Sequence, residues 1–123
     1  NICMEIQRFG IVVKVNDLDA CRIFYRELFA PLLPVMDSTF TVVFELAPNL
    51  TFSLEKSNAP YLEHSSCAQG WKFDSADFES LRRRLAAAGC ELEPEPDCRD
   101  SGLYWRGCDP EGNIILVRQL DAL

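Results

Sequence analysis

The sequence predicts an α+β protein in which the order strand–helix–strand–strand–strand occurs twice. Two observations indicate this repeat. Asp17-Leu18-Asp19 and Asp77-Phe78-Glu79 both follow an apolar run and both start an amphipathic helix, 60 residues apart. Each half then continues to an asparagine, Asn49 or Asn113, that opens its last strand at an offset of 64 residues. Such repetition indicates duplicated structural units, and chance similarity between two amphipathic helices is the alternative.

The first half begins with a strand at Phe9–Val15, where valine and isoleucine favour β-structure. Asn16 or Asp17 can cap the helix that follows, which we expect to run roughly from Leu18 to Phe29 and to stop at Pro31. Its apolar side chains recur on one face, at Cys21, Phe24, Tyr25 and Leu28. Two further strands are predicted at residues 40–46 and 50–54.

The second half repeats this pattern. A short strand at 71–74 precedes a helix that Ser75 or Asp77 can cap and that Gly89 can end. Residues 91–95 suit a short edge strand, because prolines flank and interrupt it. Further strands are predicted at Leu103–Arg106 and Ile114–Arg118, and the turn Asp109-Pro110-Glu111-Gly112-Asn113 comes just before the last one.

The length suits one domain that spans residues 1–123. We expect module 1 at about residues 9–56, a polar linker at 57–69 and module 2 at about 70–120.

Composition excludes several classes of function. The net charge of −7 and the pI near 4.6 weigh against binding to a phosphate backbone, which needs clustered lysine and arginine. No apolar run approaches the length of a membrane span, and no leader of secretory type begins the sequence, so a cytoplasmic protein is expected. The six cysteines form no Cys-x-x-Cys pair, which favours free thiols in a reducing compartment.

Three sets of residues resemble the vicinal oxygen chelate superfamily, which includes glyoxalase I, extradiol dioxygenases, and fosfomycin and bleomycin resistance proteins. They are Asp17-Leu18 with Phe24-Tyr25, the series Phe73, Asp77, Leu81, Leu85 and Gly89, and Asp109-Pro110-Glu111-Gly112-Asn113. The resemblance covers about residues 9–120. It implies two βαβββ modules whose sheets form a curved mixed sheet around a shared cavity. It also implies a homodimer, often with modules exchanged between subunits.

Catalytic members of that superfamily hold a divalent metal with His, Gln or Glu side chains on the first strand of each module and on the strand after the turn. At those positions this sequence has Gly10, Gly70 and Leu116, with Phe52 at the corresponding offset in module 1. None of these residues offers a donor atom, so we expect no metal and no cofactor. A shift of register would add only one weak ligand, Gln69.

The single histidine, His64, lies in the predicted linker. We expect His64 to have a structural or surface role. His64 and Cys67, three residues apart, could supply two metal ligands, but the sequence has no second pair that would complete a tetrahedral site. A nucleophile among Ser65, Ser66 and Cys67 is a weaker alternative, since neighbouring loop residues rarely face each other in the required geometry.

Strand alternation predicts which side chains line the cavity. If Gly10 and Gly70 point inward, their alternate neighbours do too, whereas positions such as Val13 and Phe73 pack under the helices. The predicted ligand-binding residues are Val12, Lys14, Phe52, Lys72, Asp74, Tyr104, Trp105, Leu116 and Arg118. Instead of binding a ligand, these residues could fill part of the core or form a dimer contact. For Trp105, a packing role is at least as well supported as ligand binding.

The sequence therefore favours a metal-independent protein that binds and sequesters a small organic ligand, as bleomycin resistance proteins do, and the acidic charge would suit a cationic ligand. The alternative is a lyase, isomerase or dioxygenase-like enzyme of the same fold, with a metal held elsewhere or with acid–base chemistry by Glu45, Glu55 or Asp74. A structural or regulatory domain that binds a protein partner is a third interpretation.

Overall fold

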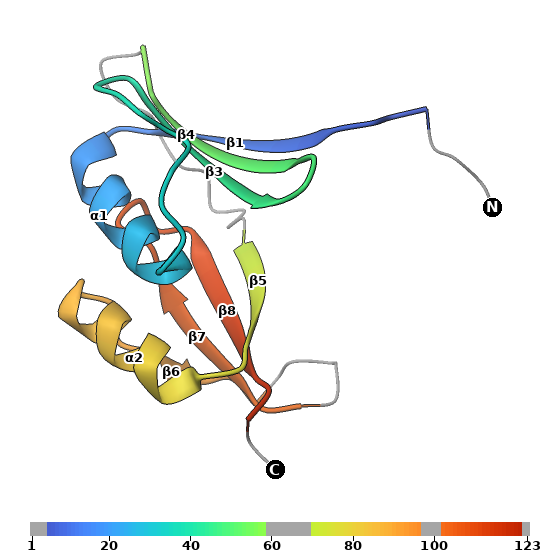
Figure 1. The fold of residues 1–123 in the computed structure, drawn as a ribbon. Helices are drawn as coiled ribbons and strands as arrows, with labels where there is room; N and C mark the ends of the chain where they lie inside the picture. The colour runs from blue at the N-terminus through green and yellow to red at the C-terminus, as the bar shows by residue number, and fades with distance from the viewer. Residues whose placement is uncertain (1–4, 59–69, 97–101, 122–123) are drawn as a thin grey trace.

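The first module is a four-stranded mixed sheet with one helix packed on one of its faces (Figure 1). The computed structural model describes residues 5–58, 70–96 and 102–121. The elements of this module are β1 (Phe9–Val15), α1 (Leu18–Phe29), β2 (Met36–Asp37), β3 (Thr41–Ala47) and β4 (Leu50–Lys56). The strand order is β1-β4-β3-β2, and β1 runs parallel to β4.

The second module repeats this topology. Its elements are β5 (Gly70–Ser75), α2 (Phe78–Ala87), β6 (Glu93–Pro94), β7 (Tyr104–Cys108) and β8 (Ile114–Gln119). The strand order β5-β8-β7-β6 matches that of the first module, and β5 runs parallel to β8. The predicted α+β fold with two βαβββ modules is therefore confirmed, although the two sheets stay separate and do not close around one cavity.

Both helices begin at an aspartate cap, and α2 is followed by a glycine. Asp17 caps α1 by accepting a 3.0 Å hydrogen bond from the Ala20 amide, and Asp77, rather than Ser75, caps α2 in the same way. After α2, Gly89 takes a φ of +90°, which glycine adopts at little cost. Among the described residues, no helix is both long and apolar enough to cross a bilayer.

The helix-covered faces of the two sheets meet in one shared core. The rings of Phe52 and Trp71 lie 5.4 Å apart, and those of Phe29 and Phe73 lie 5.5 Å apart, so each pair joins one module to the other. Helix α1 also lies beside α2. The opposite faces of the sheets, which we call the helix-free faces, therefore point away from this core.

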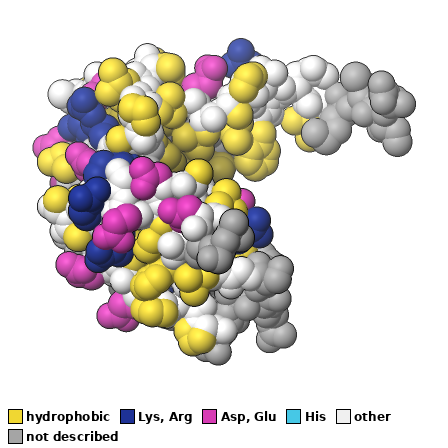
Figure 2. Space-filling model, turned by 60° about the horizontal axis from the view of Figure 1, so that its bottom comes forward, with side chains coloured by type: hydrophobic (Ala, Val, Ile, Leu, Met, Phe, Trp, Pro, Cys, Tyr) yellow, Lys and Arg dark blue, Asp and Glu magenta, His cyan; other side chains and the backbone are white. Residues whose placement is uncertain are grey.

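A space-filling view shows the resulting shape. An open hollow separates the arm that carries the N-terminus from the second module, and apolar side chains gather along that arm (Figure 2). On the helix-free face of the first sheet Val12 is 54% exposed, whereas on that of the second sheet Tyr104 is only 1% exposed.

Candidate functional site

The turn between β7 and β8 is organised around one buried carboxylate. Asp109 Oδ1 accepts hydrogen bonds from the amides of Glu111 and Asn113, and its Oδ2 accepts from the Asn113 side chain. The fourth hydrogen bond, at 2.5 Å, comes from the Tyr25 hydroxyl on α1. A buried carboxylate needs this number of donors to offset the loss of its hydration. The turn is therefore a structural joint between the modules.

The same joint raises the pKa of Tyr25. Burial is the main cause, and the negative charge and hydrogen bond of Asp109 add to it. Burial, followed by the charge of Asp109, also raises the pKa of the Cys21 thiol. These two groups stay protonated at neutral pH and are poor candidates for a nucleophile or a general base.

The helix-free face of the second sheet carries an apolar centre with charged ends. Leu116 lies on β8 beside Lys72 on β5, and both point away from the core that holds Ile115 and Val117. Lys72 Nζ lies 4.9 Å from the centre of the Tyr104 ring, close enough for a cation–π contact.

At the end of this face, Arg118 Nε lies 3.5 Å from Asp74 Oδ1. The structure thus brings together five predicted site residues, namely Lys72, Asp74, Tyr104, Leu116 and Arg118.

The helix-free face of the first sheet has a similar character. Val12 is 54% exposed, whereas its neighbours Val13 and Val15 are buried in the core, as alternation predicts. Lys14 Nζ lies 2.7 Å from Glu55 Oε1 on the adjacent strand. The predicted residues Val12 and Lys14 therefore do lie on this face. As on the second sheet, an apolar residue lies near an ion pair.

Phe52 is not on the helix-free face, so its predicted position is wrong. It pairs with Ile11 on β1, is 1% exposed, and packs against Tyr25 and Trp71 in the core. The position of β4 that corresponds to Leu116 is Ser53, because Ser53 pairs with Val12 as Leu116 pairs with Lys72. Sequence reasoning missed Ser53 through this error of one residue.

Trp105 also lies on the helix-covered side, where it has a packing role. Its ring stacks on Phe78 of α2 at 4.9 Å, and its indole N–H donates a 3.0 Å hydrogen bond to Gln119 Oε1. Tyr104 and Trp105 are adjacent in β7 and must point to opposite faces, so they could not both line one cavity. Alternation from Tyr104 instead places Arg106 on the helix-free face, where its guanidinium lies 3.6 Å from Glu95.

The predictions for His64, Cys67 and Gln69 lie outside the described residues.

Solved structures supply the comparison that decides the fold. No family model matches the sequence, and no curated protein does. A glyoxalase/bleomycin resistance protein from Albidiferax ferrireducens T118 is 23% identical, with 89% of this chain and 95% of that one covered and a TM-score of 0.69. A protein of the same description from Catenulispora acidiphila DSM 44928 is 16% identical, with 92% and 97% covered and a TM-score of 0.65.

Proteins described as enzymes or resistance determinants share the same architecture. The fosfomycin resistance protein FosX from Mesorhizobium loti is 17% identical, with 96% and 93% covered and a TM-score of 0.62. Lactoylglutathione lyase from Agrobacterium tumefaciens is 21% identical, with 92% of each chain covered and a TM-score of 0.64. This chain has the vicinal oxygen chelate fold.

The metal positions of the vicinal oxygen chelate fold, as the resemblance implies them, hold no metal-binding set in this chain. They are Gly10, Gly70, Leu116 and, by the observed register, Ser53 in place of Phe52. One hydroxyl, two glycines and a leucine do not fit a divalent cation, which needs several carboxylate or imidazole donors. In the described part of the chain, no group of three His, Cys, Asp or Glu residues could hold a metal ion.

Proposed function

We propose that this protein binds a small organic ligand on its helix-free faces and that it does so without a metal. The observation that carries the proposal is the replacement of metal ligands by Gly10, Gly70 and Leu116, beside apolar and charged side chains that remain exposed. A concave apolar surface with a few polar groups is the usual character of a small-molecule site. Proteins described as glyoxalase/bleomycin resistance proteins share the fold, and the fold is compatible with this function.

The ligand would combine an apolar body with charged substituents. Val12 and Leu116 offer the apolar contacts, and the ion pairs Lys14–Glu55 and Arg118–Asp74 lie at the ends of the two faces. The net charge of −7 favours a cationic ligand by long-range attraction. We therefore propose sequestration of a cationic metabolite or antibiotic.

A second copy of the chain would complete the site. Strands β1 and β5 are both outer strands of their sheets, so each leaves one row of backbone groups unpaired within its own sheet. On β1, Phe9 is 62% exposed and Val12 is 54% exposed, on opposite faces of the strand, so a partner that pairs with β1 could cover apolar area on both faces. We propose a homodimer on this ground, and sedimentation velocity over a range of concentrations would test it. A monomer at the highest concentration would contradict it.

One residue supports the alternative, an enzyme that uses acid–base chemistry. Glu45 on β3 pairs with Thr51 and lies exposed on the helix-free face of the first sheet. Within the described residues, Glu55 and Asp74 are held in ion pairs, whereas Glu45 makes none and could accept a proton from a substrate. Proteins described as a lactoylglutathione lyase and as the oxidase ChaP-H2 share the fold, so enzymes occur among its members.

Calorimetric titration against a panel of cationic antibiotics and metabolites, bleomycin included, tests the main proposal. Leu116→Lys places a positive charge in the apolar centre and should abolish binding of a cationic ligand. Ile23→Lys is the matched control, because Ile23 is 61% exposed on α1, away from the helix-free faces, and should bind as the wild type does. Equal affinity of both variants, or no ligand in the panel, would refute the site.

Elemental analysis separates the two functions. The binding protein should purify with far less than one divalent ion per chain and should keep its affinity after EDTA treatment. A stoichiometric ion, removed together with an activity, would instead establish a metalloenzyme.

A further inference from the structure

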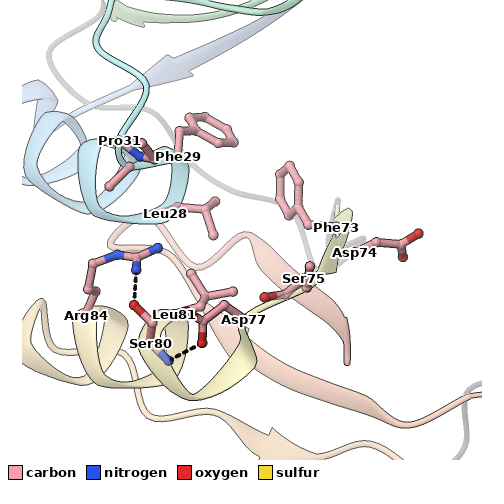
Figure 3. A pocket seen from close by; sticks show the side chains of 12 residues that line it. Leu28, Phe29, Pro31, Phe73, Asp74, Ser75, Asp77, Ser80, Leu81 and Arg84 are labelled. Carbon is pink, nitrogen blue, oxygen red and sulfur yellow. Dashed lines mark hydrogen bonds between the residues drawn. The ribbon is translucent and has the colours of Figure 1, made fainter. Parts of the chain in front are cut away.

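A cavity lies on the helix-covered side of the molecule, where the end of α1, the end of β5 and the start of α2 meet (Figure 3). Its volume is about 500 Å³, which is within the range of small-molecule sites. The described residues that line it come from both modules and include none of the residues assigned above to the helix-free faces except Asp74. It is therefore a separate candidate site.

One wall of this cavity is apolar. Phe29, Leu28 and Leu81 form it together with Phe73 and Pro31 (Figure 3). The two phenylalanine rings meet edge to face at 5.5 Å and join α1 to β5. Because the wall belongs to the shared core, it is preformed and would bind a hydrocarbon chain without reorganisation.

The opposite side of the cavity offers a cation with unused donors. Arg84 donates from Nε to the Glu27 carbonyl at 3.2 Å and from Nη1 to Ser80 Oγ at 2.6 Å. A guanidinium has five N–H donors, so most of them are left over after these two bonds. Among the described residues, no carboxylate lies within 4.0 Å of Arg84, and both of its acceptors are neutral.

The acidic side chains of the cavity do not neutralise Arg84. Asp77 Oδ1 accepts a hydrogen bond from the Ser80 amide at the start of α2, and Asp74 points away from the cavity towards Arg118. The hydroxyl of Ser75 points into the cavity and makes no side-chain hydrogen bond within the described part of the chain. The polar side of the site therefore presents the donors of Arg84 and Ser75, beside the Asp77 carboxylate that caps α2.

We propose that this cavity binds a small aliphatic or aromatic carboxylic acid. The carboxylate accepts hydrogen bonds from Arg84 and Ser75, and the hydrocarbon part packs on Phe29 and Leu81. Arginine binds a carboxylate through paired N–H donors, and the apolar wall gives the free energy that a lone surface ion pair lacks. The ligand class is opposite in charge to the one proposed for the helix-free faces, so the two sites are distinguishable.

Titration with octanoate, followed by calorimetry and by NMR shifts of Leu28 and Leu81 methyl groups, tests this proposal. Octanoate should bind and shift these methyls, and neutral octanol should bind at least about tenfold more weakly, because it cannot pair with a guanidinium. Equal affinity for octanoate and octanol would overturn the carboxylate assignment. Failure of octanoate to shift either methyl at millimolar concentration would overturn the site. This comparison needs no variant of the protein.

Variants then assign the donor. Arg84→Gln should weaken octanoate binding about tenfold or more, whereas Arg83→Gln, an exposed neighbour on α2 that does not line the cavity, should leave it unchanged. Ser75→Ala should weaken binding by a smaller factor and hardly alter the fold. Equal effects of the Arg83 and Arg84 variants, each confirmed as folded by its melting temperature, would overturn the role of Arg84. Leu116→Lys should not change octanoate binding, because Leu116 does not line this cavity. A negative result for the carboxylate site would therefore leave the proposed site on the helix-free faces untouched, and the reverse also holds.

Discussion

The hydroxyl of Tyr25 on α1 donates a 2.5 Å hydrogen bond to Asp109 Oδ2, which belongs to the other module. The two residues are 84 positions apart in the chain, and both are buried. Through this bond the turn before β8 is fixed to the helix of module 1. A turn that carries part of the family resemblance in the sequence therefore holds the two modules together.

Tyr25→Phe should lower the free energy of unfolding by about 1.5–3 kcal/mol, because the charged and buried Asp109 loses one of its four donors. Urea denaturation of Tyr25→Phe, Asp109→Asn and the double variant measures the coupling directly. We expect the double variant to cost clearly less than the sum of the single ones. Strict additivity would mean that the bond contributes nothing to stability.

A second contact between the modules involves the same turn. The Glu111 carboxylate accepts hydrogen bonds from the Asn16 amide at 2.9 Å and from the Asp17 amide at 3.2 Å, just before α1. Glu111→Gln keeps one acceptor and loses the charge, so it should cost about 1 kcal/mol in urea denaturation at low salt. Glu93→Gln, on the exposed edge strand β6, is the control and should change stability by less than about 0.5 kcal/mol. An equal loss in both variants would contradict this role.

Much of the fold could be predicted from local chemistry. The aspartates at Asp17 and Asp77 cap the helices as expected, and alternation in β1 separates Val12 from Val13 correctly. These features depend on residues that are close in sequence, where periodicity and capping act directly.

The prediction for Phe52 is wrong by one residue because the turn before β4 is defined by its backbone conformation and not by residue type. The sequence pattern aligns Asn49 with Asn113, but Asn49 has a φ of +66° and corresponds to Gly112, which has a φ of +89°. Asparagine and glycine share the left-handed conformation that such turns require. The cavity beside Arg84 could not be predicted either, because residues from both modules form it and no linear pattern connects them.

Stability should fall as the pH rises above about 9. Burial raises the folded-state pKa values of the Cys21 and Cys90 thiols and of the Tyr25 hydroxyl. The unfolded chain releases these protons near pH 8.5 for cysteine and near pH 10 for tyrosine, whereas the folded chain keeps them. The stabilising effect is therefore complete below these values and is lost above them, by up to about 1.4 kcal/mol per pH unit for each group.

Urea denaturation from pH 7 to pH 11 measures this slope. Tyr25→Phe should remove the part of the slope that begins near pH 10 and leave the part that begins near pH 8.5. A flat profile in the wild type would contradict burial of these groups in solution.

The described cysteines should differ in reactivity. Cys108 is exposed, whereas Cys21 and Cys90 are buried and their pKa values are raised. Because the thiolate is the reactive form, iodoacetamide at pH 8 should modify Cys108 at least about tenfold faster than Cys21 in the native protein. Peptide mapping by mass spectrometry gives the rate at each position. In urea the rates should become similar, and a fast native reaction at Cys21 would indicate that α1 detaches from the core.

Gly107 on β7 leaves no room for a side chain. A Cβ atom at this position would lie 2.5 Å from Cys90 Sγ and 3.0 Å from Leu92 Cδ2. Gly107→Ala should therefore lower the free energy of unfolding by about 1–3 kcal/mol, because the buried neighbours must move. Gly10→Ala is the matched control in β1, since its Cβ would approach only the Thr51 hydroxyl, at 3.0 Å, and we expect a smaller loss.

Removing the Cys90 sulfur gives a stricter test of the steric contact at Gly107. In a Cys90→Ala background the nearer neighbour is gone, so the cost of Gly107→Ala should fall by a measurable part of its wild-type value. The Leu92 contact remains, so the rescue should be partial. The same cost in both backgrounds would show that the Cys90 side chain does not limit the position, and that strand β7 lies further from the segment after α2 than the structure describes.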